Sequence, residues 1–200
     1  MELRERITEE ATRQFLQYGI RNVTMDGIAT SLGISKRTVY EIFKDKTELV
    51  HVCLDILTKK HEEKNNEIIS NSRNVIETIF TFMREGIKAM TSINPVFFFD
   101  MKKFYPVTWD SLSEENERKA FNLTKKLLER GIKEGLFRSD INIAIVSKLF
   151  HEQMKLVADD NIFPREDYNY ADIFQSLTIN FMRGISTNKG IKVIDTMIYT

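Results

Sequence analysis

Residues 25–44 read MDGIATSLGISKRTVYEIFK, and the spacing of their small and apolar positions predicts a helix-turn-helix. In the first short helix, Ala29 leaves room for a second helix to approach closely. Gly33 follows at the corner, where the chain needs a positive φ that costs glycine little. Val39 and Ile42 then direct the second helix back into the same small core. This stretch therefore predicts two short helices that pack together across a tight turn.

The second of these helices begins after Ser35, which is a good N-cap residue. Its outward positions carry basic, hydroxyl and aromatic side chains, which suit contacts with phosphates and base edges. A DNA-binding helix-turn-helix places its second helix in the major groove, so the pattern favours DNA binding. The residues expected to face outward are Lys36, Arg37, Thr38 and Tyr40.

The charge of this region is close to neutral, whereas tight non-specific DNA binding usually needs a stronger positive excess. Over residues 25–46, four basic residues oppose three acidic ones, and a dimer would only double that small excess. A helical hairpin without a DNA function therefore stays open as an interpretation of the same residues.

The composition of the whole chain favours a folded, soluble protein. Its 200 residues include 29 basic and 29 acidic side chains, so no global field attracts a polyanion or a membrane surface. The single cysteine, Cys53, excludes an intramolecular disulfide and suits a reducing compartment. The N-terminus resembles no signal peptide, and no apolar run is long enough to span a bilayer. We therefore expect a cytoplasmic protein with no membrane partner.

Helical periodicity dominates the chain, and alternating strand patterns and internal repeats are missing. A first amphipathic helix ends near Gly19, and Asp45 and Glu48 have the spacing of a capping box that opens a long helix. The later helices are expected at about residues 46–69, 74–90, 94–104, 106–134, 142–160, 168–186 and 191–198. The sequence thus predicts an all-α protein.

Two domains are expected: a three-helix DNA-binding domain over residues 1–46 and a larger helical domain over residues 47–200. There is no glycine between Gly33 and Gly86, and the first proline is Pro95. Because no flexible linker separates the two domains, motion in one should be felt in the other. The long helix at 46–69 is the expected lever.

The histidines do not form a catalytic or metal-binding pattern. His61 and His151 each lack the second histidine of a helical zinc-hydrolase motif, because Asn65 and Lys155 stand four residues further on. There is also no glycine-rich phosphate loop and no nucleophile elbow. We therefore expect a protein that is not an enzyme and that holds no metal and no cofactor.

The chain resembles the TetR family of transcriptional regulators in two places. One is the run GISKRTVY at residues 33–40, and the other is LERGIKEGLFRSD at residues 128–140, which is similar to the end of the family's long central helix. The residues that continue the first match are Phe43, Lys46, Glu48 and Leu49. The match is close only over the first fifty residues.

This resemblance implies a homodimer in which each subunit has an N-terminal DNA-binding unit and a C-terminal ligand-binding and dimerisation domain. Lys46 would hold a phosphate, and Thr24 and Ser35 would offer caps or backbone amides to phosphates. The expected DNA-contacting residues are Thr24, Ser35, Lys36, Arg37, Thr38, Tyr40, Lys44 and Lys46.

The chain departs from the family's pattern at Glu41 and Ile42. Many members place a neutral or aromatic residue at the first position, and a histidine or aromatic residue at the second. Glu41 near a phosphate would repel it, so its carboxylate either reads a cytosine amino group or points aside. This departure bears on sequence specificity.

An aromatic cluster in the second domain suggests an effector pocket. Phe97, Phe98 and Phe99 together sweep about 200° of a helix, so that helix should be enclosed on several sides or border a cavity. A packed core is the simpler interpretation of each residue alone, but the resemblance to ligand-responsive regulators favours a largely apolar pocket. The candidate ligand-binding residues are Met83, Met90, Phe97, Phe98, Met101, Phe104, Tyr105, Trp109, Phe121 and His151. We expect a bulky, mostly apolar or aromatic effector.

Two helices near the C-terminus carry more apolar surface than one core contact uses. Such faces can serve a subunit's own core and a twofold-related partner together, although burial within one subunit is the alternative. The candidate dimer residues are Ile145, Leu149, Leu156, Ile173, Leu177 and Phe181.

The sequence therefore predicts a ligand-responsive repressor that binds a palindromic double-stranded DNA operator as a homodimer. Its half-sites should lie about 10 base pairs apart, and a small, largely apolar effector should release it. The alternative is a helical small-molecule-binding or protein-interaction module without a DNA function.

Overall fold

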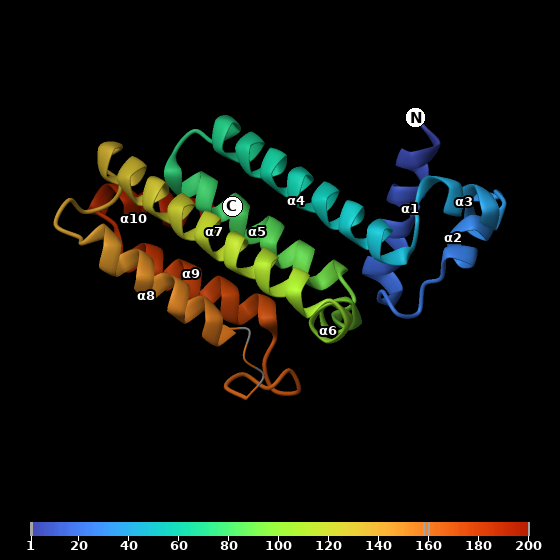
Figure 1. Ribbon diagram of the computed structural model, residues 1–200. Coiled ribbons are helices and arrows are strands. Elements are labelled where there is room, and N and C mark those ends of the chain that lie inside the picture. Colours follow the sequence, from blue (N-terminus) through green and yellow to red (C-terminus); the bar gives the residue numbers. More distant parts are fainter. Residues whose placement is uncertain (1, 158, 160, 200) are drawn as a thin grey trace. The chain divides into compact units, whose positions relative to one another are not determined.

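The computed structural model describes residues 2–157, 159 and 161–199. This part of the chain contains helices and no strand, which confirms the predicted all-α class (Figure 1). The helices are α1 (Leu3–Tyr18), α2 (Met25–Leu32), α3 (Lys36–Ile42), α4 (Lys46–Asn71), α5 (Val75–Ser92), α6 (Pro95–Phe104), α7 (Pro106–Lys133), α8 (Ile143–Val157), α9 (Tyr170–Ile185) and α10 (Asn188–Tyr199). None of these helices is long and apolar enough to cross a membrane.

The chain folds into two compact units. Unit 1 comprises residues Met1–Asn66 and Met90–Leu112, and unit 2 comprises residues Glu67–Ala89 and Ser113–Thr200. Unit 1 thus contains the helix-turn-helix and also α6, which follows it by more than fifty residues in the sequence. The functional division at residues 46 and 47 stays a prediction.

One hydrophobic core holds unit 1 together. It includes apolar residues of α1, α2 and α3 and of the first turns of α4. From α6, Phe97 and Met101 join the same core, with exposed fractions of 7% and 1%. The three N-terminal helices therefore share their core with α4 and α6, as expected for a unit too small to bury enough apolar surface alone.

A close contact fastens α6 to the loop that follows α1. The carboxylate of Asp100, which is buried, accepts a hydrogen bond of 2.7 Å from the backbone N–H of Arg21. A Cβ atom at Gly19 would lie 2.6 Å from Cγ1 of Val96 and 2.9 Å from Oδ2 of Asp100. Gly19 also has a φ of 81°, so both the space and the backbone require glycine there.

Glu10 on α1 makes the folding of unit 1 sensitive to acid. Its carboxylate accepts hydrogen bonds of 2.6 Å and 3.0 Å from Arg13 and one of 2.7 Å from Gln14. The bond to Arg13 is the main cause that lowers the pKa of Glu10 from 4.5 to about 2, and partial burial opposes it. Because the folded-state pKa is lowered, the stabilisation is complete above pH 4.5 and is lost as the pH falls towards 2.

We therefore expect the wild type to lose about 1 kcal/mol more unfolding free energy than Glu10→Gln between about pH 5 and pH 2. Urea unfolding of both proteins across this range measures the difference. Parallel losses in the two proteins would contradict the role assigned to Glu10.

Unit 2 has its own core, in which the turn after α7 is tightly packed. This core contains residues of α5, α7, α9 and α10. The ring of Phe137 is buried so closely against α7 that a Cβ atom at Gly131 would lie 2.0 Å from its Cδ2. Gly135 lies within this turn and has a φ of 67°. The glycines of the 128–140 motif therefore make room for Phe137 and let the chain reverse.

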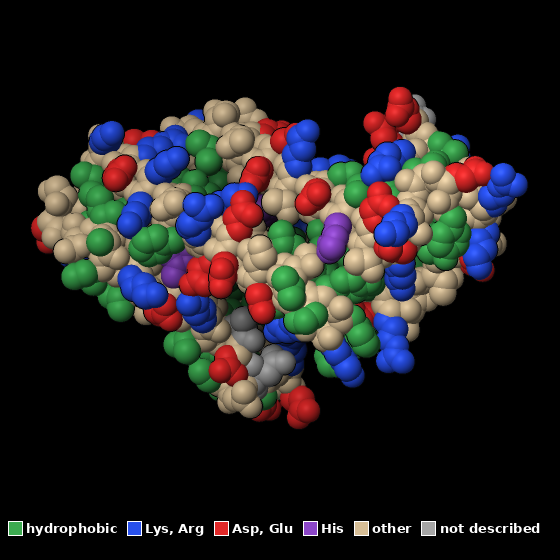
Figure 2. All heavy atoms as spheres, viewed as in Figure 1, with side chains coloured by type: hydrophobic (Ala, Val, Ile, Leu, Met, Phe, Trp, Pro, Cys, Tyr) green, Lys and Arg blue, Asp and Glu red, His purple; other side chains and the backbone are tan. Residues whose placement is uncertain are grey.

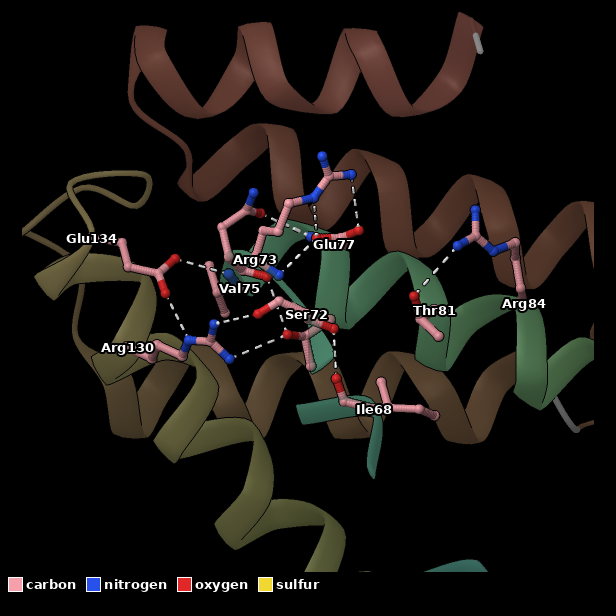
Figure 3. A network of polar contacts seen from close by, with 11 residues as sticks. Ile68, Ser72, Arg73, Val75, Glu77, Thr81, Arg84, Arg130 and Glu134 are labelled. Atoms are coloured by element: carbon pink, nitrogen blue, oxygen red, sulfur yellow. Dashed lines mark hydrogen bonds and ion pairs between the residues drawn. The ribbon is translucent and has the colours of Figure 1, made fainter. Parts of the chain in front are cut away.

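A polar network joins the turn between α4 and α5 to the end of α7 (Figure 3). Arg130 donates hydrogen bonds through Nε to Glu134 at 2.6 Å, and through Nη2 to the carbonyl of Ser72 at 3.2 Å. Its Nη1 donates to Oγ1 of Thr78 at 3.3 Å. Glu134 in turn accepts a bond of 2.8 Å from the N–H of Val75. One arginine thus satisfies groups from three segments of unit 2.

Ser147 on α8 is fully buried, and its hydroxyl has no hydrogen-bond partner among the described residues. We expect Ser147→Ala to raise the unfolding free energy by about 1 kcal/mol, because it removes an unpaired buried hydroxyl and favours the helix. The matched control is Ser186→Ala, since the Ser186 hydroxyl donates to the Met182 carbonyl at 2.7 Å. That variant should be less stable by a similar amount. Urea unfolding distinguishes the two, and destabilisation by both would be contrary to this expectation.

Candidate nucleic-acid interface

Local hydrogen bonds cap the starts of α2 and α3. Oγ1 of Thr24 accepts a bond of 3.0 Å from the N–H of Gly27, and Oγ of Ser35 accepts one of 3.1 Å from the N–H of Thr38. Gly33 lies between the helices in the left-handed conformation, with a φ of 66°. Both predicted N-caps and the predicted glycine corner are therefore confirmed. The two caps and the turn at Gly33 together fix the orientation of α3 relative to α2.

The exposed face of α3 centres on Arg37. Val39 is completely buried and Ile42 is half-buried, so these two side chains mark the inward face. At about 100° per residue, the direction midway between them lies about 170° from Arg37. The side chain of Arg37 is 88% exposed, and Tyr40 on the same face is also exposed. Lys36, Arg37 and Tyr40 thus face outward as predicted, whereas Thr38 is half-buried.

Each cation at the start of α3 is paired with a carboxylate of unit 1. Nζ of Lys36 lies 2.8 Å from Oδ1 of Asp26 on α2, and this contact raises the pKa of Lys36. Nε of Arg37 donates a hydrogen bond of 2.8 Å to Oε1 of Glu41, one turn further along α3. Glu41, whose role the sequence leaves open, is therefore a partner of Arg37. In the free protein, these two pairs partly neutralise the face of α3.

The start of α4 is closed by its own side chains. Asp45 accepts a bond of 2.9 Å from the N–H of Glu48, but the Glu48 carboxylate bonds the N–H of Lys44 rather than that of Asp45. One of the two bonds of the predicted capping box is therefore present, and the other goes to the residue before the expected one. Lys44 is exposed and Lys46 is half-buried. Burial lowers the pKa of Lys46, and the charge of Asp100 opposes this shift.

Arg4 on α1 supports the end of α3, although its sequence position carries no signal for this role. Its Nη1 donates a bond of 3.2 Å to the carbonyl of Ile42, and its guanidinium lies 4.5 Å from the centre of the Phe43 ring. The contact joins residues 38 positions apart, so neither spacing nor periodicity indicates it. Arg4 therefore helps to hold α3 against α1.

The predicted effector residues are divided between the two units. Phe97 and Met101 belong to the core of unit 1, which agrees with the packed-core interpretation of these two residues. Phe99, by contrast, is 58% exposed. The expectation that this helix is enclosed on several sides is therefore wrong for its Phe99 side. The predicted residues in unit 1 are Met90, Phe97, Phe98, Met101, Phe104, Tyr105 and Trp109; those in unit 2 are Met83, Phe121 and His151.

In unit 2, His151 lies among aromatic rings. Its Nε2 is 3.0 Å from Oγ1 of Thr124, and its ring centre is 5.5 Å from that of Phe121 and 5.8 Å from that of Phe150. Burial lowers the pKa of His151. Met83 belongs to the core of the same unit.

No group of three or more histidine, cysteine, aspartate or glutamate side chains that could hold a metal occurs in the described part of the chain.

Apolar side chains are exposed along α8. Ile145, Leu149 and Leu156 have exposed fractions of 57%, 55% and 46%. Figure 2 shows hydrophobic side chains at the surface over this helix, interspersed with charged ones. Leu149 and Leu156 also line a groove of about 620 Å³ together with Leu177 and Phe181 of α9. Ile173, the remaining residue of the predicted dimer set, is half-buried on α9.

Comparison with known proteins agrees with this arrangement. The model of the family described as bacterial regulatory proteins, tetR family, matches residues 7–53. The HTH-type transcriptional regulator YhgD of Bacillus subtilis is 26% identical over 136 residues, which cover 66% of this chain and 70% of that protein. The HTH-type transcriptional repressor KstR2 of Rhodococcus jostii is 26% identical over 152 residues, which cover 74% of each chain.

Solved structures show the same fold. A putative transcriptional regulator from Saccharomonospora viridis, solved in complex with choline, has a TM-score of 0.73 at 17% identity and covers 92% of this chain and 98% of its own. The ketosteroid transcriptional regulator KstR2 of Mycobacterium tuberculosis has a TM-score of 0.55 at 19% identity, with 94% and 96% covered. The segment matched by the family model runs from α1 into α4 and contains the whole helix-turn-helix. The helix-turn-helix unit of this chain therefore belongs to the TetR family, whose members are DNA-binding transcriptional regulators and not enzymes.

Proposed function

We propose that this regulator is a repressor that binds a palindromic operator as a homodimer and is released by a small, largely apolar effector. The observation that carries the proposal is the outward face of α3, where Lys36, Arg37 and Tyr40 are exposed on a helix whose start is capped by the Ser35 hydroxyl. This face suits insertion into a major groove. Lys44 and Lys46 near the start of α4 supply positive charge for phosphates.

The apolar faces of α8 and α9 support a twofold dimer. Exposed leucines and isoleucine on α8, next to the groove shared with α9, are the kind of surface that a four-helix interface buries. Two copies of α3 would then meet half-sites about 10 base pairs apart on one side of the duplex.

The effector site is proposed for unit 2, near His151 and Phe121. A histidine and a threonine hydroxyl among aromatic rings would orient a mostly apolar molecule through one polar group. The choline complex of one structural relative and the ketosteroid regulator among the others support a small-molecule effector for this fold. Effector binding would shift α4, which contains no glycine or proline, and weaken operator binding through a coupling of about 1–3 kcal/mol.

The experiment that tests DNA binding is a gel-shift and footprinting titration on the DNA that flanks the protein's own gene. Lys36→Ala and Tyr40→Ala should each weaken binding, while both proteins keep their helical circular dichroism. Unchanged retardation in both variants would refute the assignment of α3. The same titration with added cellular metabolites tests release, and operator affinity that never depends on them would refute the effector.

A second candidate function is a small-molecule-binding or protein-interaction module without DNA activity. The ion pairs of Lys36 with Asp26 and of Arg37 with Glu41 favour it, because they reduce the positive field of α3. Absence of any footprint for the wild type would support this candidate over the repressor.

A further inference from the structure

Arg37 occupies the position on α3 that lies most directly opposite the buried face of this helix. It is the second residue of the helix, and N-terminal residues of a recognition helix contact base edges. It also lies about 170° from the middle of the buried face, whereas Lys36 lies about 100° round the helix from Arg37. In a helix seated in the major groove, Arg37 is therefore aimed at the base pairs, and Lys36 lies to one side of it.

Glu41 holds the arginine through the nitrogen that base recognition does not need. Its Oε1 accepts the 2.8 Å hydrogen bond from Nε of Arg37. The terminal nitrogens Nη1 and Nη2 donate no hydrogen bond to any residue in the described ranges. The tether limits the rotamers of a long, exposed side chain and leaves the two terminal nitrogens free to bind together.

We infer that Arg37, positioned by Glu41, reads a guanine in each operator half-site; this inference rests on the proposed DNA binding. Guanine presents two acceptors, O6 and N7, side by side in the major groove, and they match two parallel N–H donors of a guanidinium. Adenine presents a donor where guanine has O6, so the same fork discriminates against it. Glu41 is a positioning residue, because it acts on the base through Arg37.

Lys36 provides the matched comparison within the same face. Its ammonium also pairs with a carboxylate, that of Asp26 at 2.8 Å, but a single point charge carries no bidentate pattern. Removal of Asp26 and removal of Glu41 therefore both delete one negative charge near the DNA. Only the second deletion should alter base preference.

The test is selection of binding sites from random duplex DNA by the full-length wild type, followed by titration of single-base variants of the selected site. The wild type should select an invariant guanine in each half-site. Arg37→Ala and Arg37→Lys should each reduce preference for that guanine by about 5-fold to 150-fold. Replacing the guanine with 7-deazaguanine should weaken the wild type and leave Arg37→Ala unaffected.

Glu41→Ala should show two opposite effects. Binding to random duplex should strengthen, because a charge that repels phosphates is lost, while preference for the guanine should fall by about 3-fold to 10-fold. Asp26→Ala should strengthen binding to random duplex and leave the preference unchanged. In the Arg37→Ala background, Glu41→Ala should not change the preference further.

Three results would overturn the inference while the proposed function stands. One is a selected site whose base preferences Arg37→Ala leaves intact. Another is a Glu41→Ala variant that binds all sequences more tightly with unchanged preference, which would make Glu41 only a repulsive charge. The third is loss of a cytosine preference in Glu41→Ala at a position insensitive to Arg37→Ala, which would make Glu41 a direct reader. Failure of the wild type to select any site would instead refute the proposed function.

Discussion

Replacing Leu149 with glutamate is expected to convert the proposed dimer into monomers at about micromolar concentration and to weaken operator binding by more than about 100-fold. Leu149 is 55% exposed in one subunit and lines the groove between α8 and α9, so the proposed partner would bury it. An unpaired carboxylate at that place would lose its hydration without a compensating contact. A monomer can occupy only one half-site at a time. Sedimentation velocity and a gel-shift titration measure the two effects.

The matched control for Leu149→Glu is Ala144→Glu on the same helix. Ala144 is also exposed but lies about 140° round α8 from Leu149. The control should keep both the dimer and the operator affinity of the wild type. A Leu149→Glu variant that sediments as the wild type does and retains full operator affinity would place the dimer contact elsewhere.

Arg130→Ala is expected to lower the unfolding free energy by about 3 kcal/mol. The arginine side chain is 29% exposed and donates to Glu134, to Thr78 and to the carbonyl of Ser72. Its removal leaves the Glu134 carboxylate without its main counter-charge and the Ser72 carbonyl with one bond fewer. Equilibrium unfolding in urea, followed by circular dichroism, measures the loss.

The control for Arg130→Ala is Arg138→Ala. Arg138 is half exposed, and its Nε lies 3.7 Å from a carboxylate oxygen of Asp140, so this pair should contribute less than about 0.5 kcal/mol. Equal losses in the two variants would mean that the network in Figure 3 adds nothing beyond an ordinary surface charge. A loss confined to Arg130→Ala supports its role in joining α4, α5 and α7.

The features that the sequence predicts well depend on neighbouring residues. Thr24, Ser35 and Gly33 have their hydrogen-bond partners within three or four residues, so the sequence alone is enough to predict their capping and turn roles. Most helix bounds also agree within two residues, because helical periodicity is local. The expected helix over 142–160 is an exception, since α8 ends at Val157, and residues 158 and 160 lie outside the described part of the chain.

The features that the sequence does not predict depend on distant partners. Arg130 contacts Ser72 across 58 positions, and Asp100 contacts Arg21 across 79. The burial of the aromatic cluster at residues 97–99 is also hard to predict from sequence, because periodicity cannot distinguish a packed core from the wall of a cavity. Phe97 is buried in unit 1 while Phe99, two residues later, is exposed. The pair of Arg37 and Glu41 has the i,i+4 spacing of a helical ion pair and could have been predicted.

The contact at Gly19 has a genetic consequence. Any side chain at this position would collide with Val96 and Asp100, so α6 would have to leave the loop after α1. If operator binding depends on that docking, missense changes at position 19 would switch on the controlled genes without inducer. A screen for constitutive mutants would then recover codon 19, far in the sequence from the proposed effector residues. In such mutants, regulation would be lost because a side chain at position 19 has no room beside α6, and not because effector binding is impaired.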